Sequence, residues 1–430
     1  MKSSRVLERW RGAFAITATP GSSRLPVAYQ LRCFSQSHVR NAANDGGEGS
    51  KGVPELPTAA KSSILGNLKR GRGGRSSFSG IVATVFGPSG FLGPYVINHL
   101  GKMGSQVIVA HRCDPYDVRD AKVSGDLGQI LYNQIDLRDE DSIRRSIKYS
   151  NVVINLIGRD YATKRFSLEQ VHVEGARRIA RLSKEAGVER LIHLSALNAT
   201  EKPKRIILPK GSEFLASKWR GEQAVREEFP EAVIIRPSDI FGAEDRFVNY
   251  YVRGGRRVFK YMPLWKSGEA TWKQPVHSSD VAAGIINAIR SPIAPGRIID
   301  AVGPKRYQLS ELVDWMFRLM RRSPEMWGYI RGPLDPITIL KIACSSAFAF
   351  KFSKSDWQRV EREYVTDERT PGALDLEDLG ITNLKPMEDY VPWLVKGSRA
   401  YNYYTDDLGE FPDAGIPPSS SGARNAELLV

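Results

Sequence analysis

The stretch IVATVFGPSGFLG, residues 81–93, contains the strongest structural signal in the chain. Its first half is a short apolar run rich in β-branched residues, typical of a buried strand, and residues 94–100 continue with a helical pattern. Gly87 permits a tight turn, Gly90 lets backbone N–H groups approach a pyrophosphate, and Gly93 permits close packing of helix on strand. This spacing between a strand and a helix predicts a dinucleotide site.

The helix after this turn would direct its N-terminal N–H groups and its partial positive charge at the phosphates of the dinucleotide. We expect backbone contacts to these phosphates from four residues of the turn, which are Ser89, Gly90, Phe91 and Leu92. The alternative is a tight turn without a ligand. The repeated pattern of strands and helices that follows the turn favours the dinucleotide site.

The second predicted strand, residues 106–110, ends in His111 and Arg112. Enzymes that use NAD usually place an acidic residue here, which accepts a hydrogen bond from the ribose 2′-hydroxyl. The guanidinium of Arg112 cannot accept that bond but suits a 2′-phosphate, so the sequence favours NADPH over NADH. Asp114 lies two residues further on and leaves NADH open as the alternative.

Strands and helices continue to alternate along the next part of the chain. We expect further strands at residues 131–135, 152–157, 191–194 and 233–235, and helices at residues 141–148, 166–186 and 218–228. Strands that are separated by helical segments pair in parallel through right-handed crossovers. The predicted fold class is therefore α/β, with a doubly wound parallel sheet and a smaller, mixed C-terminal lobe.

The net charge of +14 is concentrated at the N-terminus. Residues 1–40 contribute +6 and residues 41–80 contribute +3, so the rest of the chain carries only +5. The body is therefore not strongly basic, which argues against a nucleic-acid partner. The 3 cysteines are scattered and the 6 histidines lack metal-ligand spacing, so we expect a reducing compartment and no metal. No run of about eighteen apolar residues is present to span a bilayer.

Residues 1–34 are rich in Arg and Ser and almost free of acidic residues, which is typical of a mitochondrial targeting presequence. Arg32 and the aromatic Phe34 fit a processing pattern with cleavage after Phe34. A disordered basic tail and a chloroplast transit peptide are the alternatives. Residues 35–79 have the Gly, Ser and Pro content of a flexible linker, although the basic, glycine-rich run at 69–75 leaves RNA or lipid binding open.

The body of the chain carries further strings in a fixed order. They are Asp136-Leu137, Asn155-Leu156-Ile157-Gly158, His193-Leu194-Ser195, the run from Arg236 to Gly242, and Val276 with Asp280-Val281-Ala282. With the glycine spacing, these strings resemble the short-chain dehydrogenase/reductase superfamily in its extended and atypical branches. The resemblance covers residues 80–305 and implies a Rossmann fold.

This resemblance also implies which other residues contact the dinucleotide. They are Asp136 near the adenine, with Leu137 beside it; Ile157 and Gly158 on the ribose side, with the adjoining Leu156; and Lys218, Pro237 and Ile240 near the nicotinamide, with Ser195. Alternatively, Lys218 is a solvated helix lysine and Ser195 is a simple strand-end serine.

In that superfamily, catalysis depends on a tyrosine four residues before a lysine. Lys218 is in place here, but the tyrosine position is Phe214. A phenyl ring has no titratable proton, so the usual acid/base step has no carrier and we assign no catalytic residue. The alternative is an active NADP-dependent reductase, epimerase or dehydratase in which another group, such as Tyr161 or a bound water, replaces the phenol.

Longer strings are similar to a narrower family, the nucleotide-binding accessory subunits of mitochondrial respiratory complex I. They lie at residues 156–160, 183–190, 236–247, 273–276 and 376–381. The resemblance implies an NADPH that is held structurally and is not turned over. It implies other complex I subunits, of the matrix arm and the arm junction, as partners. It also implies a peripheral location on the matrix side of the inner membrane and leaves contact with membrane lipid open.

These patterns predict the domain organisation of the remaining chain. We expect a Rossmann NADP(H)-binding domain at residues 80–244, a C-terminal lobe at 245–395 with returns to the sheet near 273–305, and an extended tail at 396–430 that becomes ordered only against another surface. The aromatic and basic residues interleaved over 250–272 predict core and cleft lining, and leave an organellar RNA-binding protein as a third alternative.

Two helical patterns stand out in the predicted C-terminal lobe. Residues 310–320 form an amphipathic stripe that is typical of a core helix. Residues 336–350 are unusually apolar and are too short to span a membrane. This second segment would dock on a partner subunit or at a bilayer surface, or form a plain buried helix.

Overall fold

A computed structural model describes residues 69–421, with the exception of 164, 254–259, 327, 335, 337–338, 341–356, 405–408 and 410. The predicted presequence, the greater part of the linker and most of the apolar segment at 336–350 therefore lie outside the described residues. The described residues belong to one unit, Leu56–Val430.

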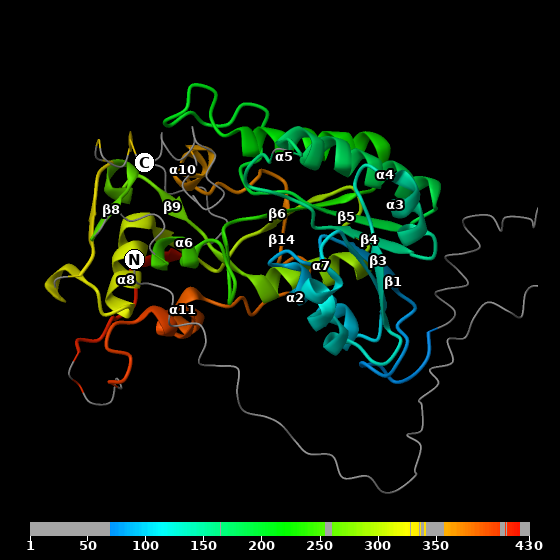
Figure 1. The fold of residues 1–430 in the computed structure, drawn as a ribbon, viewed down its shortest axis with the longest axis horizontal. Coiled ribbons are helices and arrows are strands. Elements are labelled where there is room, and N and C mark those ends of the chain that lie inside the picture. Colours follow the sequence, from blue (N-terminus) through cyan, green and yellow to red (C-terminus); the bar gives the residue numbers. More distant parts are fainter. Residues whose placement is uncertain are drawn as a thin grey trace, which may run out of the picture. The chain divides into compact units, whose positions relative to one another are not determined.

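A sheet of eight strands lies at the centre of the fold (Figure 1). In spatial order the strands are β14 (Leu374–Asp375), β11 (Ile298–Ala301), β6 (Val233–Pro237), β5 (Arg190–Leu194), β4 (Val152–Asn155), β1 (Val82–Phe86), β2 (Gln106–His111) and β3 (Ile130–Gln134). All neighbouring pairs run parallel. The strand order reverses beside β1, and such a switch point places a crevice at the carboxyl ends of the strands on either side.

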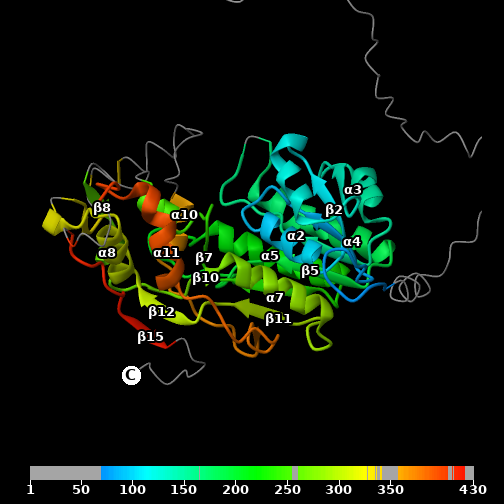
Figure 2. The same cartoon turned by 90° about the horizontal axis from the view of Figure 1, so that it is seen from below.

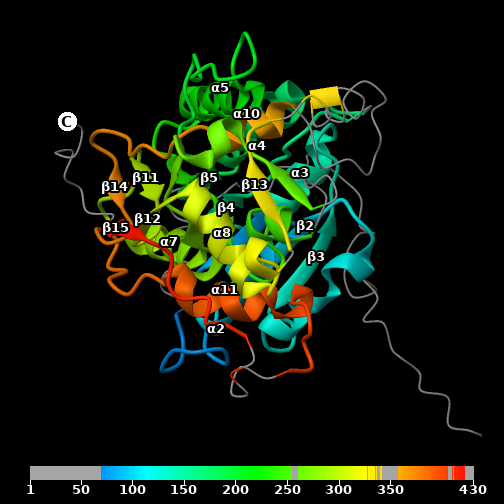
Figure 3. The same cartoon turned by 90° about the vertical axis from the view of Figure 1, so that its left-hand side faces the viewer.

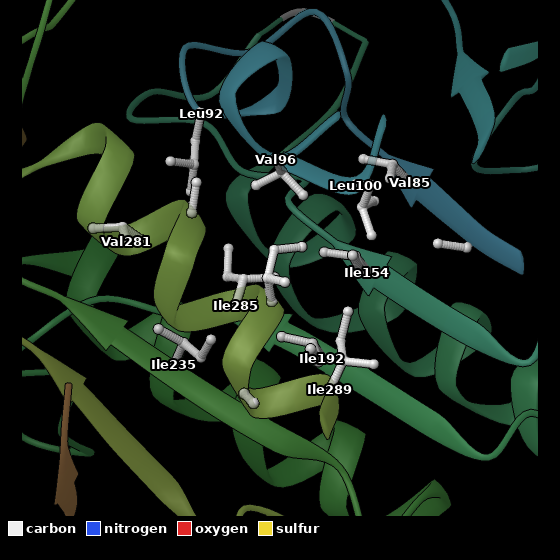
Figure 4. Close-up of a cluster of buried hydrophobic side chains, with 14 of the residues drawn as sticks. Val85, Leu92, Val96, Leu100, Ile154, Ile192, Ile235, Val281, Ile285 and Ile289 are labelled. Atoms are coloured by element: carbon white, nitrogen blue, oxygen red, sulfur yellow. The ribbon is translucent and has the colours of Figure 1, made fainter. Parts of the chain in front are cut away.

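Helices cover both faces of this sheet. Helices α2 (Gly93–Lys102) and α7 (Ser278–Arg290) pack together on one face (Figure 2). Their apolar side chains meet those of the strands in one buried cluster, where Val96 of α2 and Ile285 of α7 lie near Ile154 of β4 (Figure 4). Helices α3 (Glu140–Ile147), α4 (Gly175–Glu185) and α5 (Glu213–Glu228) bury a second cluster on the other face. The predicted doubly wound α/β fold is confirmed.

Helix α5 begins at Glu213, five residues before the predicted start of its helix at residue 218, and two other elements differ from the sequence prediction for physical reasons. The predicted strand 152–157 ends at Asn155, because the Asn155 side chain accepts a hydrogen bond from the backbone N–H of Ile157 (3.1 Å) and turns the chain. The predicted helix 166–186 starts with a π-helical turn, Gln170–Glu174, before α4 begins. Such π turns occur often at functional sites, and His172 of this turn lies beside the pocket described below.

The C-terminal lobe has its own apolar core, formed mainly by aromatic and aliphatic side chains that include Tyr251, Trp315 and Phe317. Its helices are α6 (Val248–Val252), α8 (Leu309–Leu319), α10 (Trp357–Glu363) and α11 (Met387–Val395). Its strands are β7 (Ile240–Phe241), β8 (Tyr261–Pro263), β9 (Trp272–Lys273), β10 (Val276–His277), β12 (Lys305–Gln308), β13 (Ile330–Gly332) and β15 (Ser419–Ser421). Short 3₁₀ turns occur in this part of the chain at Trp265–Gly268, Pro324–Met326 and Lys396–Ser398. A further 3₁₀ segment, Pro115–Ser124, lies between β2 and β3 of the main sheet.

The lobe is tied to the main sheet and to the tail in ways that the sequence did not predict. Besides β11, the short strand β14 also returns to the main sheet. The described part of the tail lies against the lobe, because β15 pairs with β12 and the indole N–H of Trp315 donates to the carbonyl of Gly415 (2.9 Å). Among the described residues, no helix is both long and apolar enough to cross a membrane.

Candidate functional site

The glycine-rich turn between β1 and α2 is closely packed against its surroundings. Gly87 has a φ of +80°, and a Cβ there would lie 3.1 Å from the backbone N of Ile157. A Cβ on Gly93 would lie 2.2 Å from the carbonyl oxygen of Pro88, so only glycine lets α2 start this close to the turn. A Cβ on Gly90 would meet only the Gly87 oxygen, at 3.4 Å. Of these three glycines, Gly90 is therefore the one at which a missing side chain leaves space in the pocket.

A pocket lies at the carboxyl ends of the central strands. Its lining includes many of the predicted contact residues, namely Gly87, Gly90, Phe91, Leu92, Gly93, Leu156, Gly158, Ser195, Lys218, Pro237 and Ile240. The predicted residues Ser89, Arg112, Asp136, Leu137 and Ile157 are not part of this lining. The structure therefore brings together the residues expected around the pyrophosphate and the nicotinamide.

The residues predicted on the adenosine side lie at the carboxyl ends of β2 and β3. Arg112 is exposed, and its guanidinium carbon lies 5.4 Å from the ring centroid of Phe166. Asp136 is exposed and accepts a hydrogen bond from the backbone N–H of Arg138 (3.0 Å). The side chain of Leu137 is buried in the apolar cluster under α3 and α4. Contact of these residues with a nucleotide stays a prediction.

Lys218 is buried and points into the pocket. The Nζ of Lys218 donates to the carbonyl of Leu194 (2.9 Å). A Cβ on Gly158 would lie 3.0 Å from this Nζ. Burial lowers the pKa of Lys218 to about 8. The hydroxyl of Ser195 is also buried and has no hydrogen-bond partner among the described residues. Lys218 is therefore not a solvated helix lysine, and both groups retain hydrogen-bonding capacity toward the pocket.

Phe214 lines the pocket, and the ring of a neutral histidine packs against it. The rings of Phe214 and His172 are nearly perpendicular, with centroids 5.5 Å apart. His172 Nε2 accepts from the backbone N–H of Arg159 (3.1 Å), so Nδ1 carries the proton and donates to the hydroxyl of Ser217 (2.8 Å). Burial, followed by Lys218, lowers the pKa of His172 well below its ordinary value. His172 therefore serves as a structural support in its neutral form.

The pocket lining also contains a network of charged residues, which the sequence analysis did not assign to the site. Asp160 pairs with Arg246 (3.3 Å) and with Arg362 (3.4 Å), and the Arg362 guanidinium lies 4.6 Å from the Phe214 ring centroid. Burial would raise the pKa of Asp160, but Arg362 and Arg246 hold it well below its ordinary range. Asp160 and Arg362 therefore both stay ionised at physiological pH.

A second ion cluster lies in the same part of the pocket. Lys273 pairs with Asp239 (3.0 Å) and with Asp367 (3.4 Å), and its side chain is almost fully buried. Asp160, Asp239, Arg246 and Lys273 belong to strings that the sequence analysis quoted for the family resemblance, but no local pattern indicates that they pair with Arg362 and Asp367. Their partners lie far away in the sequence, so periodicity does not identify them.

The described residues contain no group of three or more His, Cys, Asp or Glu side chains that is arranged to hold a metal ion.

Comparison with known proteins agrees with this geometry. Residues 83–301 match the model of the NAD dependent epimerase/dehydratase family. The chain belongs to this family. The epimerase/dehydratase match runs from β1 to β11 and covers seven of the eight strands of the main sheet, all except β14, together with the glycine-rich turn and Lys218.

This epimerase/dehydratase family member also has relatives that align along most of their length. It is 44% identical over 369 residues to the NADH dehydrogenase [ubiquinone] 1 alpha subcomplex subunit 9, mitochondrial, of Mus musculus, with coverage of 83% of this chain and 93% of the relative. It is 37% identical over 361 residues to the NADH-ubiquinone oxidoreductase 40 kDa subunit, mitochondrial, of Neurospora crassa, with coverage of 83% and 88%. The predicted resemblance to complex I subunits is confirmed.

A solved structure with the same fold is that of the Bordetella bronchiseptica enzyme WbmH in complex with NAD+. It is 14% identical, its TM-score is 0.53, and the alignment covers 75% of this chain and 99% of that chain. At this identity the likeness supports the fold alone.

The pocket residues fit a dinucleotide. A Cβ on Gly90 would meet only the Gly87 oxygen, so the turn leaves room there for a phosphate to approach the backbone. The buried hydroxyl of Ser195 has no partner among the described residues, and the Lys218 ammonium uses one of its three protons on Leu194. Both groups would find hydrogen-bond partners in the hydroxyl groups of a ribose placed in this pocket.

Proposed function

We propose that the chain is a non-catalytic accessory subunit of mitochondrial complex I that holds NADPH as a structural ligand. The names of its relatives support the assignment to complex I. The proposed location is the matrix side of the inner membrane, and the proposed partners are other subunits of the matrix arm and of its junction with the membrane arm. The family model supports a nicotinamide dinucleotide in the pocket.

The observation that carries the non-catalytic part is the phenyl ring of Phe214 in the lining of the pocket, at the position where the family's catalytic tyrosine would lie. When bound, the dinucleotide supplies hydride chemistry, which needs a partner group that exchanges a proton with the substrate. Phe214 offers none, and His172 behind it is held neutral by burial. Lys218 is fixed by the carbonyl of Leu194 and is left to orient the ribose. The remaining residues bind the dinucleotide and exclude water.

A ligand that is not turned over still stabilises the fold to which it binds. At a thousandfold excess over Kd, binding to the folded state alone adds about 4 kcal/mol to the free energy of unfolding. Typical domains are stable by only about 5–15 kcal/mol, so NADPH would supply a large share of the stability of this subunit.

The test is to isolate complex I by native electrophoresis and to identify the nucleotide that is released when the band is denatured. We expect this chain to migrate with complex I and to release NADPH in stoichiometric amount. A chain that migrates outside complex I would contradict the assembly assignment, and an assembled subunit that releases no nucleotide would contradict the structural role of NADPH.

The choice of NADPH over NADH is tested at Arg112. We expect Arg112→Asp to lower the preference for NADPH by about 10- to 100-fold, because a charge-assisted hydrogen bond contributes about 1.5–3 kcal/mol. Competition titrations with both nucleotides measure this ratio. The exposed Arg119 supplies the control, since Arg119→Asp makes the same charge change away from the carboxyl end of β2. An unchanged ratio in Arg112→Asp would show that the 2′-phosphate lies elsewhere.

A further inference from the structure

Residues 357–370, here called the strap, run from the C-terminal lobe across the pocket. The strap consists of α10 and the extended chain after it, and α10 lies beside α5 in two perpendicular views (Figures 1 and 3). Five of its residues line the pocket together with the glycine-rich turn, namely Arg359, Arg362, Glu363, Val365 and Asp367. The nucleotide pocket is therefore closed on one side by a segment that lies outside the family match.

The first half of the strap is anchored by Glu361. Its side chain is fully buried, and its two carboxylate oxygens accept from the backbone N–H groups of Ile206 (2.6 Å), Ile207 (2.7 Å) and Leu208 (3.0 Å). Hydrogen bonds to an ionised acceptor are among the strongest in proteins. Glu361 thus fixes α10 against the loop that precedes α5.

The second half of the strap is anchored at two further points. Asp367 pairs with Lys273 and accepts from the backbone N–H of Gln274 (2.9 Å). The backbone N–H of Thr370 donates to Asp300 at the end of β11 (2.6 Å). Bonds at both ends restrict the strap to one position over the pocket.

Between these anchors the strap places Arg362 over Phe214. The guanidinium lies 4.6 Å from the ring centroid, which is within the range of a cation–π contact, and it pairs with Asp160 (3.4 Å). Arg246 holds Asp160 from the other side (3.3 Å). Burial would lower the pKa of Arg362, but Asp160 and Asp239 raise it, so the guanidinium stays charged and paired.

We propose that the side chain of Arg362 blocks the substrate side of the nucleotide pocket, and we call it the stopper. It would shield the bound nicotinamide from water and from hydride acceptors, so that no substrate is reduced. The inference rests on the proposed function for the identity of the nucleotide. A substrate must reach both the nicotinamide and the residue at position 214. Here the face of the Phe214 ring is covered by a partly buried ion pair of the protein itself, which adds a second barrier to turnover beside the missing phenol.

Arg359 provides a matched control on the same helix. It also lines the pocket, but its guanidinium lies over the ring of Tyr250 (3.9 Å) and donates to the carbonyl of Arg246. Arg359→Met and Arg362→Met therefore remove the same charge from the same helix face. Only the second change uncovers Phe214. Arg362→Lys is a third variant that keeps the charge on Asp160 and withdraws the planar group from the ring.

The experiment uses the full-length chain loaded with NADPH and follows the fluorescence of the bound nicotinamide. Acrylamide, a neutral quencher, measures access from solvent, and a chase with excess NADP+ measures the dissociation rate of NADPH. In Arg362→Met we expect a rise of about threefold in the quenching constant, because water and solutes enter the opened site. We expect dissociation to be about tenfold faster, because changes in affinity appear mainly in the off-rate. Arg362→Lys should move both quantities in the same direction.

The outcomes separate this inference from the proposed function. A native chain that binds no NADPH contradicts the proposed function itself. Full NADPH binding with unchanged quenching and dissociation in both Arg362 variants overturns the stopper. Equal changes in Arg359→Met and Arg362→Met also overturn it, because the effect would then belong to the helix as a whole. Faster quenching or faster release in the Arg362 variants alone supports it, including in a variant that loses NADPH during purification.

Discussion

Replacing Glu222 by glutamine is expected to lower the free energy of unfolding by about 3–5 kcal/mol, the cost of leaving one partner of a buried ion pair alone. Both oxygens of Glu222 accept from the guanidinium of Arg236, at 2.9 and 2.6 Å, and the carboxylate is fully buried. Glutamine keeps the shape of the side chain. The expected loss therefore comes from the charge of Arg236, which loses its paired carboxylate and keeps only a hydrogen bond to Thr370 (3.0 Å) and a Coulombic interaction with Asp300.

Urea unfolding measures this loss, and the same helix offers the control. Glu227 of α5 pairs with Arg177 at the surface (2.9 Å), with 64% of its side chain exposed. Glu227→Gln should cost less than about 1 kcal/mol, because exposed ion pairs contribute little. The double change Glu222→Leu with Arg236→Met should recover most of the lost stability, since a buried pair can be replaced by apolar residues of similar volume. Equal losses in Glu222→Gln and Glu227→Gln would refute this account.

Replacing Gly93 by alanine is expected to weaken NADPH binding by about 100-fold, or roughly 3 kcal/mol. The added Cβ would lie 2.2 Å from the carbonyl oxygen of Pro88 and 2.6 Å from its carbon, and both atoms belong to the backbone. The turn and the first residues of α2 must then move apart. The backbone N–H groups that would bind the pyrophosphate lie on these two segments, so their alignment is lost.

Isothermal titration with NADPH measures this change in Kd. Gly397→Ala is the control, because a Cβ there would meet no atom within 4 Å. Thermal unfolding without nucleotide shows whether the fold survives. Gly93→Ala should be destabilised by about 1–3 kcal/mol, the usual cost of overpacking. An NADPH affinity equal to that of the native chain would show that the phosphates do not contact this turn.

Much of the fold follows from local patterns in the sequence. A β-branched run followed by GPSGFLG predicts a strand, a tight turn and a helix, and the alternation of strands and helices up to residue 235 predicts parallel pairing. The structure confirms this sheet. The π-helical turn at Gln170–Glu174 was missed because it keeps a helical apolar pattern. Strand β14 was missed because two residues are too few to show any period.

The candidate site likewise contains residues that local sequence patterns predict and residues that they do not. Gly87, Gly90 and Lys218 are recognisable because a short motif holds the backbone conformation or the spacing that their chemistry needs. The contact of Arg362 with Asp160 and Phe214 has no such local signal, since it joins three segments that are distant in the sequence. The same holds for Glu361, which binds three backbone N–H groups of a loop about 150 positions earlier.

Local sequence patterns are therefore sufficient to predict the part of the pocket that is formed by the glycine-rich turn, Phe214 and Lys218. Glycine is required wherever the backbone has no room for a Cβ, and the phenyl ring at position 214 lacks a proton whatever surrounds it. The closed side of the pocket depends on packing between the Rossmann sheet and the C-terminal lobe. Desolvation makes each buried charge there dependent on a partner, and long-range folding alone supplies those partners, as Asp160 shows by bringing together Arg246 and Arg362.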